Sequence, residues 1–336
     1  MVATQCMTYN HAPYIEDALR GFAMQETTFP VVYIVVDDAS TDSEPEVLQK
    51  WVGENLEIED GAGVWEEMPY GQLSVAPLKG KPLSLFVILL LNENHYSTRK
   101  SKMPYIAEWN ENAKYIAMCE GDDYWIDPYK LQKQVDFMEA HPEYGMCHTD
   151  FDLSDGSRRK HYKEIYYDGN YYPGNIEHEK GGIGTLTVLF RKETFDKTPK
   201  YYLQEQFVAG DKPRWYELSK EAKIKYLPEV TACYRVLPTS ASHSSSLEKM
   251  LQFREGLQHI RKYYANKYGI KLTDFKNYYT GCLRVCYQFG EAEKAKKFIA
   301  LARENRSVTM RGFFFFLGAR YNLIKKIVEL VGTRPK

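Results

Sequence analysis

Four short apolar runs, many of their residues β-branched, dominate the first 120 positions of the chain. A continuous run of this kind predicts a strand that is buried on both faces, as strands of a parallel sheet are. Helical patterns near Pro13 and Pro45 follow the first two runs, and strand–helix–strand order with short loops favours a right-handed crossover. We therefore expect a doubly wound α/β sheet. Its predicted strands include residues 2–7, 31–36, 83–91 and 115–119.

The remaining two thirds of the chain carry weaker patterns. Residues 129–140 predict a helix and residues 183–191 a strand, whereas residues 53–82 are rich in Gly, Glu and Pro and predict an insertion or a long loop. Residues 152–182 are polar and Tyr-rich, which fits a mobile loop over a site. Only helical patterns follow position 240. The expected domains are residues 1–240 and 241–336.

Composition excludes several classes of protein. With 44% hydrophobic residues, 26% charged residues and a net charge of −1, the chain is neither disordered nor a coiled-coil rod, and it has no general affinity for nucleic acid. Its 27 Tyr, 16 Phe and 5 Trp leave rings to line a ligand cleft. The N-terminus lacks the pattern of a secretory signal, and the longest apolar run is too short to cross a bilayer. We therefore expect a cytoplasmic protein.

The six cysteines are scattered, and no CxxC or Cys/His spacing suggests a zinc site. Cys282 and Cys286 are four positions apart, which places them on the same face of a helix. A buried pair of thiols is favoured over a redox pair.

Acidic residues follow two of the predicted strands directly. Asp37 and Asp38 come after the second run, and Glu120, Asp122 and Asp123 come after the fourth. The carboxyl ends of parallel strands face one crevice, where like charges repel unless a cation or hydrogen-bond donors are present. A divalent metal that also binds substrate phosphates meets this need and predicts a diphosphate-bearing substrate. The alternative is that the first cluster only caps a helix and the second only forms a turn. Two acidic clusters on strands of one sheet make this alternative less favoured.

These clusters belong to an ordered set of motifs over residues 1–240. The chain resembles the family 2 glycosyltransferases, which are inverting enzymes with the GT-A nucleotide-sugar fold. Within that family it is most similar to the bacterial subgroup with an EGDDYW motif, common in cell-surface polysaccharide synthesis. The motifs are TYNH at 8–11, VVDDASTD at 35–42, YIAMCEGDDYW at 115–125, DPYKL at 127–131, Gly210-Asp211 and CYRV at 233–236.

The resemblance implies roles on the nucleotide side of the site. The loop of Thr8, Tyr9 and Asn10 would pass under the nucleoside. Asp38, with Asp37 beside it, would accept hydrogen bonds from the base or the ribose. Cations for the diphosphate would come from Arg99, Lys100 or Lys102 on one side and from Arg235 or His243 on the other.

The resemblance also implies a metal site for Mn²⁺ or Mg²⁺. Asp122 and Asp123 would hold the ion against the diphosphate, with a turn as the alternative. Glu120 stands where many relatives have Asp, so which acid binds metal and which binds ribose stays open. His243 would be a third ligand or a diphosphate donor, although a His in a Ser-rich loop is also consistent with simple solvation.

Catalysis would fall to Asp211, which matches the position of the family's general base at a helix start. The alternative is that Asp211 only caps that helix. On the acceptor side the resemblance implies contacts from four residues, of which Trp125 is equally consistent with a place in the core. The four are Tyr124, Trp125, Thr185 and Thr187.

Residues 306–336 carry seven Lys and Arg against one acid, Glu329, and include the aromatic run 313–316. Basic residues beside Phe and Leu are typical of a helix that lies on an anionic membrane surface, and a lipid-linked acceptor would make such docking useful. A helix packed against the catalytic domain or a dimer partner is the alternative.

Together these features predict a metal-dependent inverting glycosyltransferase. It would move a sugar from a nucleoside-diphosphate donor, with UDP as the expected nucleotide, to a saccharide or lipid-linked acceptor, in the cytoplasm or at the inner face of the plasma membrane. A nucleotidyltransferase is one alternative, but it needs a Gly- and cation-rich phosphate loop that residues 8–11 lack. The other is a silent carbohydrate-binding protein, which the presence of all the acids disfavours.

Overall fold

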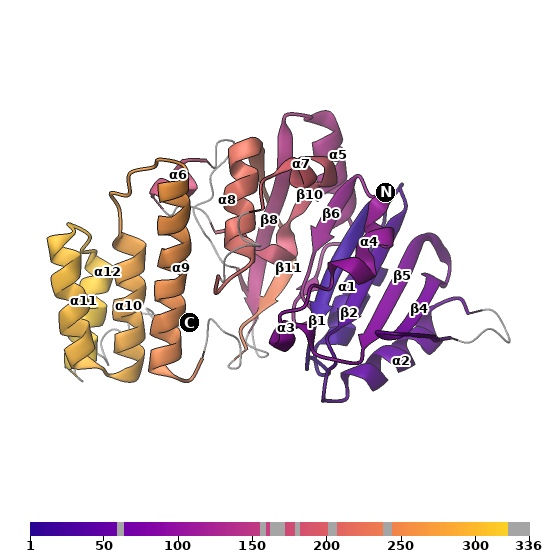
Figure 1. Cartoon of the computed structure of the whole chain (residues 1–336), viewed down its shortest axis with the longest axis horizontal. Helices are drawn as coiled ribbons and strands as arrows, with labels where there is room; N and C mark the ends of the chain where they lie inside the picture. Colours follow the sequence, from indigo (N-terminus) through magenta and orange to yellow (C-terminus); the bar gives the residue numbers. More distant parts are fainter. Residues whose placement is uncertain are drawn as a thin grey trace. The chain divides into compact units, whose positions relative to one another are not determined.

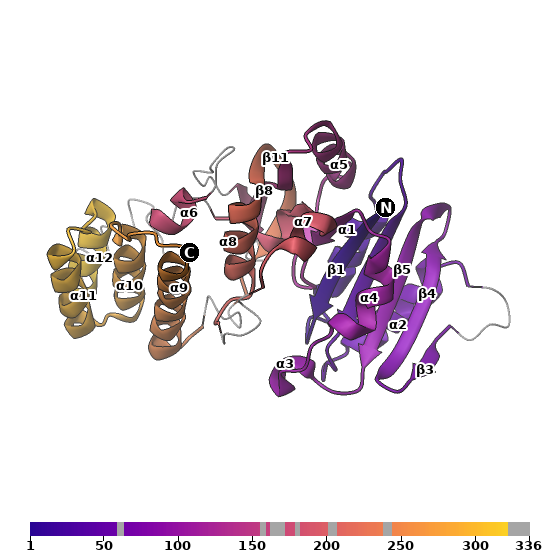
Figure 2. The same ribbon diagram turned by 45° about the horizontal axis from the view of Figure 1, so that its top comes forward.

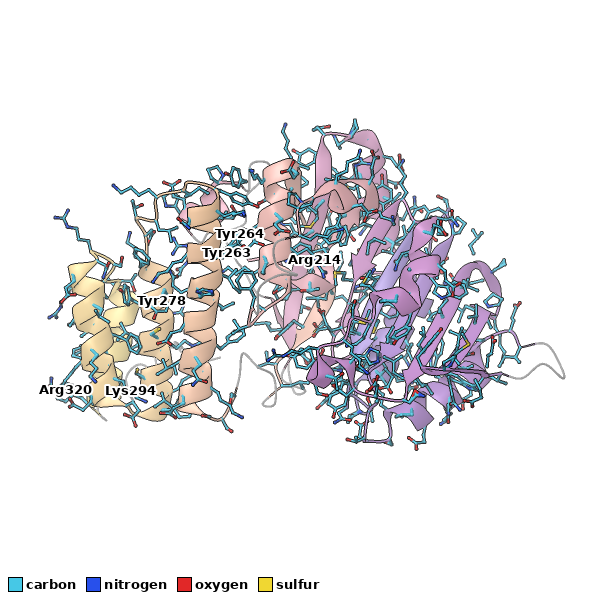
Figure 3. The ribbon with its side chains drawn as sticks, viewed as in Figure 1. Arg214, Tyr263, Tyr264, Tyr278, Lys294 and Arg320 are labelled. Atoms are coloured by element: carbon cyan, nitrogen blue, oxygen red, sulfur yellow. The ribbon has the colours of Figure 1, made fainter. Side chains whose placement is uncertain are left out.

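The computed structural model describes residues 1–58, 64–154, 159–161, 172–178, 182–200, 207–237 and 244–321 (Figure 1). The chain divides into two compact units, and the side chains of the described residues are drawn in Figure 3. The first unit is Met1–Gly169, Gly182–Thr198 and Glu221–Arg235, and the second is Asn170–Gly181, Pro199–Lys220 and Val236–Lys336. The expected boundary near residue 240 stays a prediction, because the second unit also takes in two earlier segments.

The first unit is built on one mostly parallel sheet. Parallel pairs join β1 to β2 and β6, β2 to β5, and β8 to β11. The strand order is β3-β4-β5-β2-β1-β6-β10-β8-β11-β7, with β9 paired to β8. The strands are β1 Val2–Thr8, β2 Val31–Asp37, β3 Glu66–Met68, β4 Gly71–Leu78, β5 Lys81–Leu91, β6 Tyr115–Met118, β7 Tyr124–Trp125, β8 Tyr144–Ser154, β9 Arg159–His161, β10 Leu189–Arg191 and β11 Lys223–Arg235.

The predicted strands at the centre of this sheet are confirmed as β1, β2, β5 and β6, and the expected helices after β1 and β2 and at 129–140 are also present. Almost every residue of β2 and of the second half of β5 is buried, so these strands face protein on both sides of the sheet, as predicted. The helices of this unit are α1 Ile15–Ala23, α2 Glu44–Asn55, α3 His95–Thr98, α4 Met103–Glu111, α5 Lys130–Ala140 and α7 Lys192–Lys197.

Two expectations for the first unit are wrong. The stretch 53–82 is not simply an insertion or loop, because β3 and β4 form an antiparallel hairpin within it that extends the sheet beyond β5. The predicted strand 183–191 begins instead as a 3₁₀ turn, Thr185–Thr187, and only Leu189–Arg191 pairs with neighbouring strands. The expected loop over 152–182 lies largely outside the described residues.

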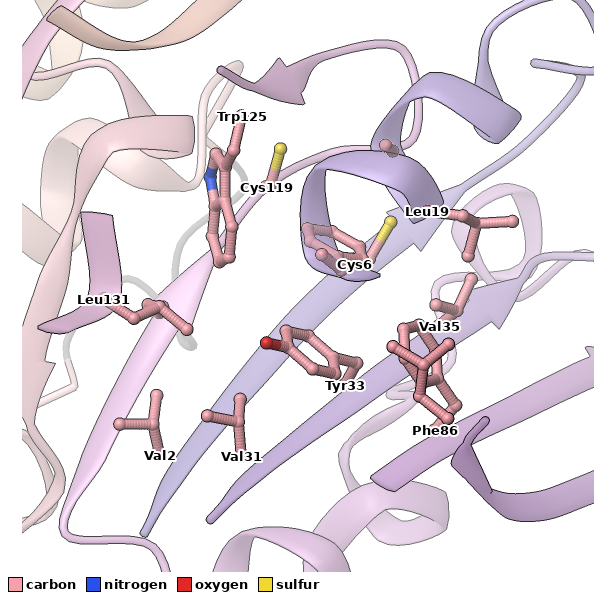
Figure 4. Packing of buried hydrophobic residues seen from close by; sticks show 14 of the residues in the cluster. Val2, Cys6, Leu19, Val31, Tyr33, Val35, Phe86, Cys119, Trp125 and Leu131 are labelled. Carbon is pink, nitrogen blue, oxygen red and sulfur yellow. The ribbon is translucent and has the colours of Figure 1, made fainter. Parts of the chain in front are cut away.

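Aromatic rings fill the core of the first unit (Figure 4). Tyr33 of β2 stacks between Phe22 of α1 and Phe86 of β5, with ring centroids 5.5 and 4.8 Å apart. Trp125 meets Phe22 edge-on at 4.9 Å. A Cβ at Gly21 would lie 2.9 Å from the backbone nitrogen of Trp125. Only glycine at this position therefore lets α1 pack so closely against the backbone of Trp125.

The second unit is helical, and no strand occurs in its described part. Figures 1 and 2 show α9, α10 and α11 side by side, and α12 also packs against α10. Cys282 and Cys286 are buried free thiols on α10, as expected. No helix within the described ranges is long and apolar enough to span a bilayer. The helices are α6 Gly174–Glu177, α8 Asp211–Glu221 (its last residue assigned to the first unit), α9 Leu247–Lys267, α10 Lys276–Phe289, α11 Ala292–Glu304 and α12 Met310–Arg320.

Candidate functional site

The loops that follow β1, β2 and β6 emerge at the same edge of the sheet, because these strands are parallel neighbours. Two of the loops are tied together through Asn10. Its side-chain oxygen accepts hydrogen bonds from the backbone N–H of Thr41 at 2.7 Å and of Asp42 at 3.3 Å. Its own N–H donates to Ser40 Oγ at 2.8 Å. Asn10 adopts a left-handed φ of 57°, which Asn tolerates better than most residues.

Glu44, at the start of α2, accepts hydrogen bonds from the loops after both β1 and β2. It is fully buried, and its carboxylate accepts hydrogen bonds from the Thr8 hydroxyl, the His11 backbone N–H at 2.8 Å and the Ser40 hydroxyl at 2.9 Å. The Ser40 hydroxyl also contacts Asp37, so its one proton is shared between the two carboxylates, and the Ser40 backbone N–H donates to Asp37 at 3.1 Å. Glu44 therefore joins the loop after β1 to the first acidic cluster, a role that the sequence analysis missed.

His11 continues the network to the second acidic cluster. Its Nδ1 lies 3.2 Å from the Thr8 hydroxyl, and its Nε2 lies 3.9 Å from the Asp122 carboxylate. A path of polar contacts therefore runs from Asp122 through His11, Thr8 and Glu44 toward Asp37. His11 was not among the residues expected to act in the site, although it stands in the TYNH motif.

Asp37 and Asp38 lie in different electrostatic environments. Burial raises the pKa of Asp37 from 3.8 to about 6; hydrogen bonds from Ser40 oppose this effect, and the charges of Glu44 and Asp42 add to it. Burial also acts to raise the pKa of Asp38, but hydrogen bonds outweigh it and the pKa is lowered. Adjacent carboxyl groups therefore differ in how readily they hold a proton.

The hydrogen bonds of Asp38 occupy most of its carboxylate. The backbone N–H groups of His95 and Tyr96 donate to it at 2.9 and 3.0 Å, which anchors the start of α3. Lys102 Nζ donates at 2.9 Å. Lys102, expected to serve the diphosphate, thus pairs with the acid expected to bind the nucleoside.

The acids of the EGDDYW motif are also divided by burial. Asp123 is buried and accepts a hydrogen bond from the Arg235 backbone N–H at 2.8 Å. Burial, followed by the charges of Asp122 and Glu120, raises the pKa of Asp123 well above its ordinary value. The Asp122 side chain is 21% exposed, so it is the aspartate of this pair that solvent reaches.

Arg235 holds the loop that carries these acids. Its Nη1 donates to the Asp122 carbonyl at 2.9 Å, and its Nη2 pairs with Asp17 of α1. The guanidinium lies 5.0 Å from the Tyr14 ring centroid and 4.6 Å from that of Tyr124, within cation–π range. Tyr124, expected on the acceptor side, is thus a packing partner of Arg235.

Gly121 allows the same loop to rest on β1. A Cβ at this position would lie 2.1 Å from the Thr8 hydroxyl oxygen, closer than any side chain permits. The glycine of the motif is therefore required for the contact between the two loops.

Four further residues expected in the site have the following places in the fold. Trp125 is buried in the core and donates from Nε1 to the Leu186 carbonyl at 2.8 Å, in agreement with the core alternative. Thr187 is buried, and its hydroxyl donates to the Gly184 carbonyl at 2.7 Å, while Thr185 starts the 3₁₀ turn. Asp211 is the first residue of α8 in the second unit.

The remaining predictions concern Tyr9 and the metal. Tyr9 is exposed in the loop after β1, where the sequence analysis placed the nucleoside. His243 lies outside the described residues. Over the described ranges, no group of three or more His, Cys, Asp or Glu side chains is spaced to hold a metal ion.

Comparison with known proteins gives relatives in sequence and in structure. No family model matches the chain. The Mycobacterium tuberculosis protein Rv1520 (strain H37Rv) and the Mycobacterium bovis protein Mb1547 are each 27% identical to it over 252 residues, which is 72% of this chain. The chain spans about 61% of the length of these relatives.

Solved structures of Staphylococcus aureus TarS residues 1–349 share the fold. The complex with UDP-GlcNAc aligns with a TM-score of 0.52 and 15% identity over 95% of this chain and 79% of TarS. The complex with UDP aligns with a TM-score of 0.50 and 13% identity over 97% and 82%. The predicted GT-A type α/β fold, a mostly parallel sheet flanked by helices and followed by a helical region, is confirmed.

The pKa of Asp37 predicts a pH-dependent change in stability. Its carboxyl group ionises near pH 3.8 when the chain is unfolded and near pH 6 when it is folded, so its contribution is present below about pH 4 and is lost as the pH rises through 6. The free energy of unfolding of wild type, relative to Asp37→Asn, should fall by ~2–3 kcal/mol over that range. Urea titrations between pH 4 and 8 measure this difference. The exposed Asp136→Asn is the control, and a pH-independent difference for Asp37→Asn would contradict the prediction.

Proposed function

We propose that this chain is a glycosyltransferase that takes a sugar from a nucleoside-diphosphate donor, with UDP as the expected nucleotide. The observation that carries this proposal is the polar network that joins the acids after β2 to those after β6 through Thr8, His11 and Glu44. Such a network holds acidic and hydroxyl groups at one sheet edge, where nucleotides bind in α/β proteins. The TarS chains, which have the same fold, are in complex with UDP and UDP-GlcNAc. Their sequence identity to this chain is low, so they support only the class of ligand, a uridine nucleotide or nucleotide sugar.

The nucleoside would lie over the loop of Thr8, Tyr9 and Asn10. Tyr9 is exposed and offers its ring to the base. The Asp38 carboxylate has four lone-pair positions and accepts three hydrogen bonds from the residues that the structure describes, so a fourth position would serve a base N–H or a ribose hydroxyl. Lys102 would exchange its contact with Asp38 for the diphosphate.

The residues present fit one divalent cation, Mn²⁺ or Mg²⁺, held largely by substrate oxygens. Asp122 is the accessible acid, and Asp123 is committed to the Arg235 N–H, so we assign the metal contact to Asp122 and a supporting role to Asp123. Burial is the main cause of the raised pKa of Asp123, and the charges of Asp122 and Glu120 add to it; a cation bound there would offset that added repulsion. Bound there, the ion would act as a Lewis acid on the diphosphate leaving group.

Asp211 would act as the general base of an inverting transfer. It would take the proton from an acceptor hydroxyl while that oxygen forms a bond to the anomeric carbon and the bond to the nucleoside diphosphate breaks. One of its oxygens accepts the Lys212 backbone N–H at 2.8 Å, which leaves the other for the acceptor. The acceptor would be a saccharide or a lipid-linked saccharide in cell-surface polysaccharide synthesis.

The competing functions would release different products. A nucleotidyltransferase would form a new phosphate bond and release pyrophosphate, and a silent binding protein would not turn over at all. Release of the nucleoside diphosphate with loss of the donor sugar therefore separates the proposed function from both.

A thermal-shift experiment tests the nucleotide and metal contacts. UDP with Mn²⁺ at ~100 times its Kd should add about 2.7 kcal/mol to the stability of the folded state and raise Tm, since ligand binds only the native chain. Asp122→Asn should remove the part of the shift that depends on Mn²⁺, and Asp136→Asn should keep it. A shift that is the same with and without Mn²⁺ in wild type would contradict the metal assignment.

The Asp211→Asn variant tests the base. Its turnover should fall by ~10²–10⁴-fold because the acceptor hydroxyl loses its proton acceptor, while the UDP thermal shift stays that of wild type. Glu221→Gln, at the other end of α8, is the matched control. Donor consumption by Asp211→Asn at the wild-type rate would sink the assignment.

Membrane contact through residues 306–336 is a further part of the proposed function. The exposed stripe of α12 and its C-cap consists of Met310, Phe314 and Tyr321, with the half-buried Leu317 between the last two. Met310 is 74% exposed, and Phe314 and Tyr321 are each 46% exposed. Residues 306–321 hold three Arg and no acid, so this stripe suits an anionic membrane surface at the cytoplasmic face.

Vesicle sedimentation tests this contact. Wild type should bind vesicles that contain phosphatidylglycerol, and Met310→Ser with Phe314→Ser should weaken binding by ~10-fold or more because buried apolar area is lost. Leu301→Ser, exposed on α11, is the control. Equal binding to neutral phosphatidylcholine vesicles, or an equal loss with Leu301→Ser, would contradict the assignment to α12.

A further inference from the structure

The second unit contains a groove of about 310 Å³ between α9 and the segment that leads into α8. This volume is at the low end of the range for small-molecule sites. The groove has an apolar side and a polar side. Its lining residues are Phe207, Val208, Gln252, Glu255, Gly256 and His259.

The apolar side is held close to α9 by a glycine. A Cβ at Gly256 would lie 2.5 Å from both methyl carbons of Val208, so this approach requires glycine. Val208 packs against the helix on that side and is still 46% exposed to the groove and solvent. An exposed valine beside a helix provides an apolar surface for the C–H face of a ligand.

An aromatic cluster fixes the position of Phe207. Its ring centroid lies 5.3 Å from that of Tyr263, 6.2 Å from that of Tyr264 and 6.1 Å from that of His259. Figure 3 shows Tyr263 and Tyr264 on α9. Phe207 is therefore a pre-positioned ring rather than a mobile one, which lowers the entropy lost on binding.

The polar side comes from one face of α9. Gln252, Glu255 and His259 are spaced by three and four residues, so their side chains project together. They are exposed, and within the described part of the chain they make no hydrogen bond or ion pair. An amide, a carboxylate and an imidazole supply both donors and acceptors, which is what hydroxyl groups need.

The groove lies next to Asp211 in the chain. Asp211 follows Val208 by three positions, so their Cα atoms are at most ~11 Å apart. On the other flank of Asp211, Tyr216 packs against Tyr264 at 5.5 Å, and the Tyr264 hydroxyl donates to Glu217 at 2.6 Å. Both flanks of Asp211 are thus packed on α9, and the groove and the proposed base belong to the same part of the second unit.

We propose that this groove binds a neutral sugar ring of the acceptor. The inference rests on the proposed function, because it takes Asp211 as the base. The C–H groups on the face of a sugar ring would contact the apolar side of the groove, Phe207 and Val208. The hydroxyls on its edge would bind the three polar side chains of α9. The lining holds one carboxylate and no Lys or Arg, so an anionic ligand, such as the phosphate of a lipid carrier, is disfavoured.

Saturation-transfer NMR with the full chain tests the groove without turnover. The probes are the methyl glycosides of glucose, galactose, mannose, rhamnose and N-acetylglucosamine. At least one should bind, and Glu255→Ala and His259→Ala should each weaken it by about fivefold or more, since each removes a hydrogen-bonding group. Asn266→Ala is the control, because it is exposed on the same helix ~10 Å further along.

Kinetics provide the second readout. Both groove variants should raise KM for the acceptor with little change in kcat, and they should leave hydrolysis of the donor sugar in the absence of acceptor unchanged. Binding of no glycoside, or binding that the variants do not alter, overturns the inference even if Asp211→Asn behaves as expected. Glycoside binding that depends on the groove, without transfer from any nucleotide sugar, would overturn the proposed function and leave the saccharide site in place.

Discussion

The arrangement at the carboxyl edge of the sheet depends on one buried carboxylate, that of Glu44. A buried charge is tolerated only when donors surround it, and here the donors come from two different loops, through Thr8, His11 and Ser40. The acid therefore fixes the separation of the loops after β1 and β2. Loss of any one donor would leave part of a desolvated charge without compensation, so these loops form as a unit.

The four aspartates of the two acidic clusters differ in burial and in hydrogen bonding, and these differences separate their roles. Asp37 and Asp123 are buried and hydrogen-bonded to the chain around them, and their pKa values are raised. Asp38 is also buried, but its three donors lower its pKa, and Asp122 is open to solvent. Within each adjacent pair one carboxyl group supports the loop, and the other has a basic side chain beside it, Lys102 for Asp38 and His11 for Asp122, which lets two like groups persist side by side.

Much of this fold was predictable because β2, β6 and the second half of β5 are buried almost throughout and are nearly all apolar, and because most residues of β1 are apolar too. Strand β8 was not, because His148, Thr149 and Asp150 are buried polar residues inside it and break the apolar run. In the site, the acids were found because they directly follow strands. Glu44 was missed because an acid in the first turn of a helix is ordinary, and only the surrounding donors distinguish it.

Arg235 links the acidic motif to the course of the chain itself. Its backbone N–H binds Asp123, and it is the last residue of β11 and of the first unit. The polypeptide thus leaves this unit directly beside the acids, so any shift of the chain at position 235 moves a hydrogen-bond donor of Asp123 together with the end of β11.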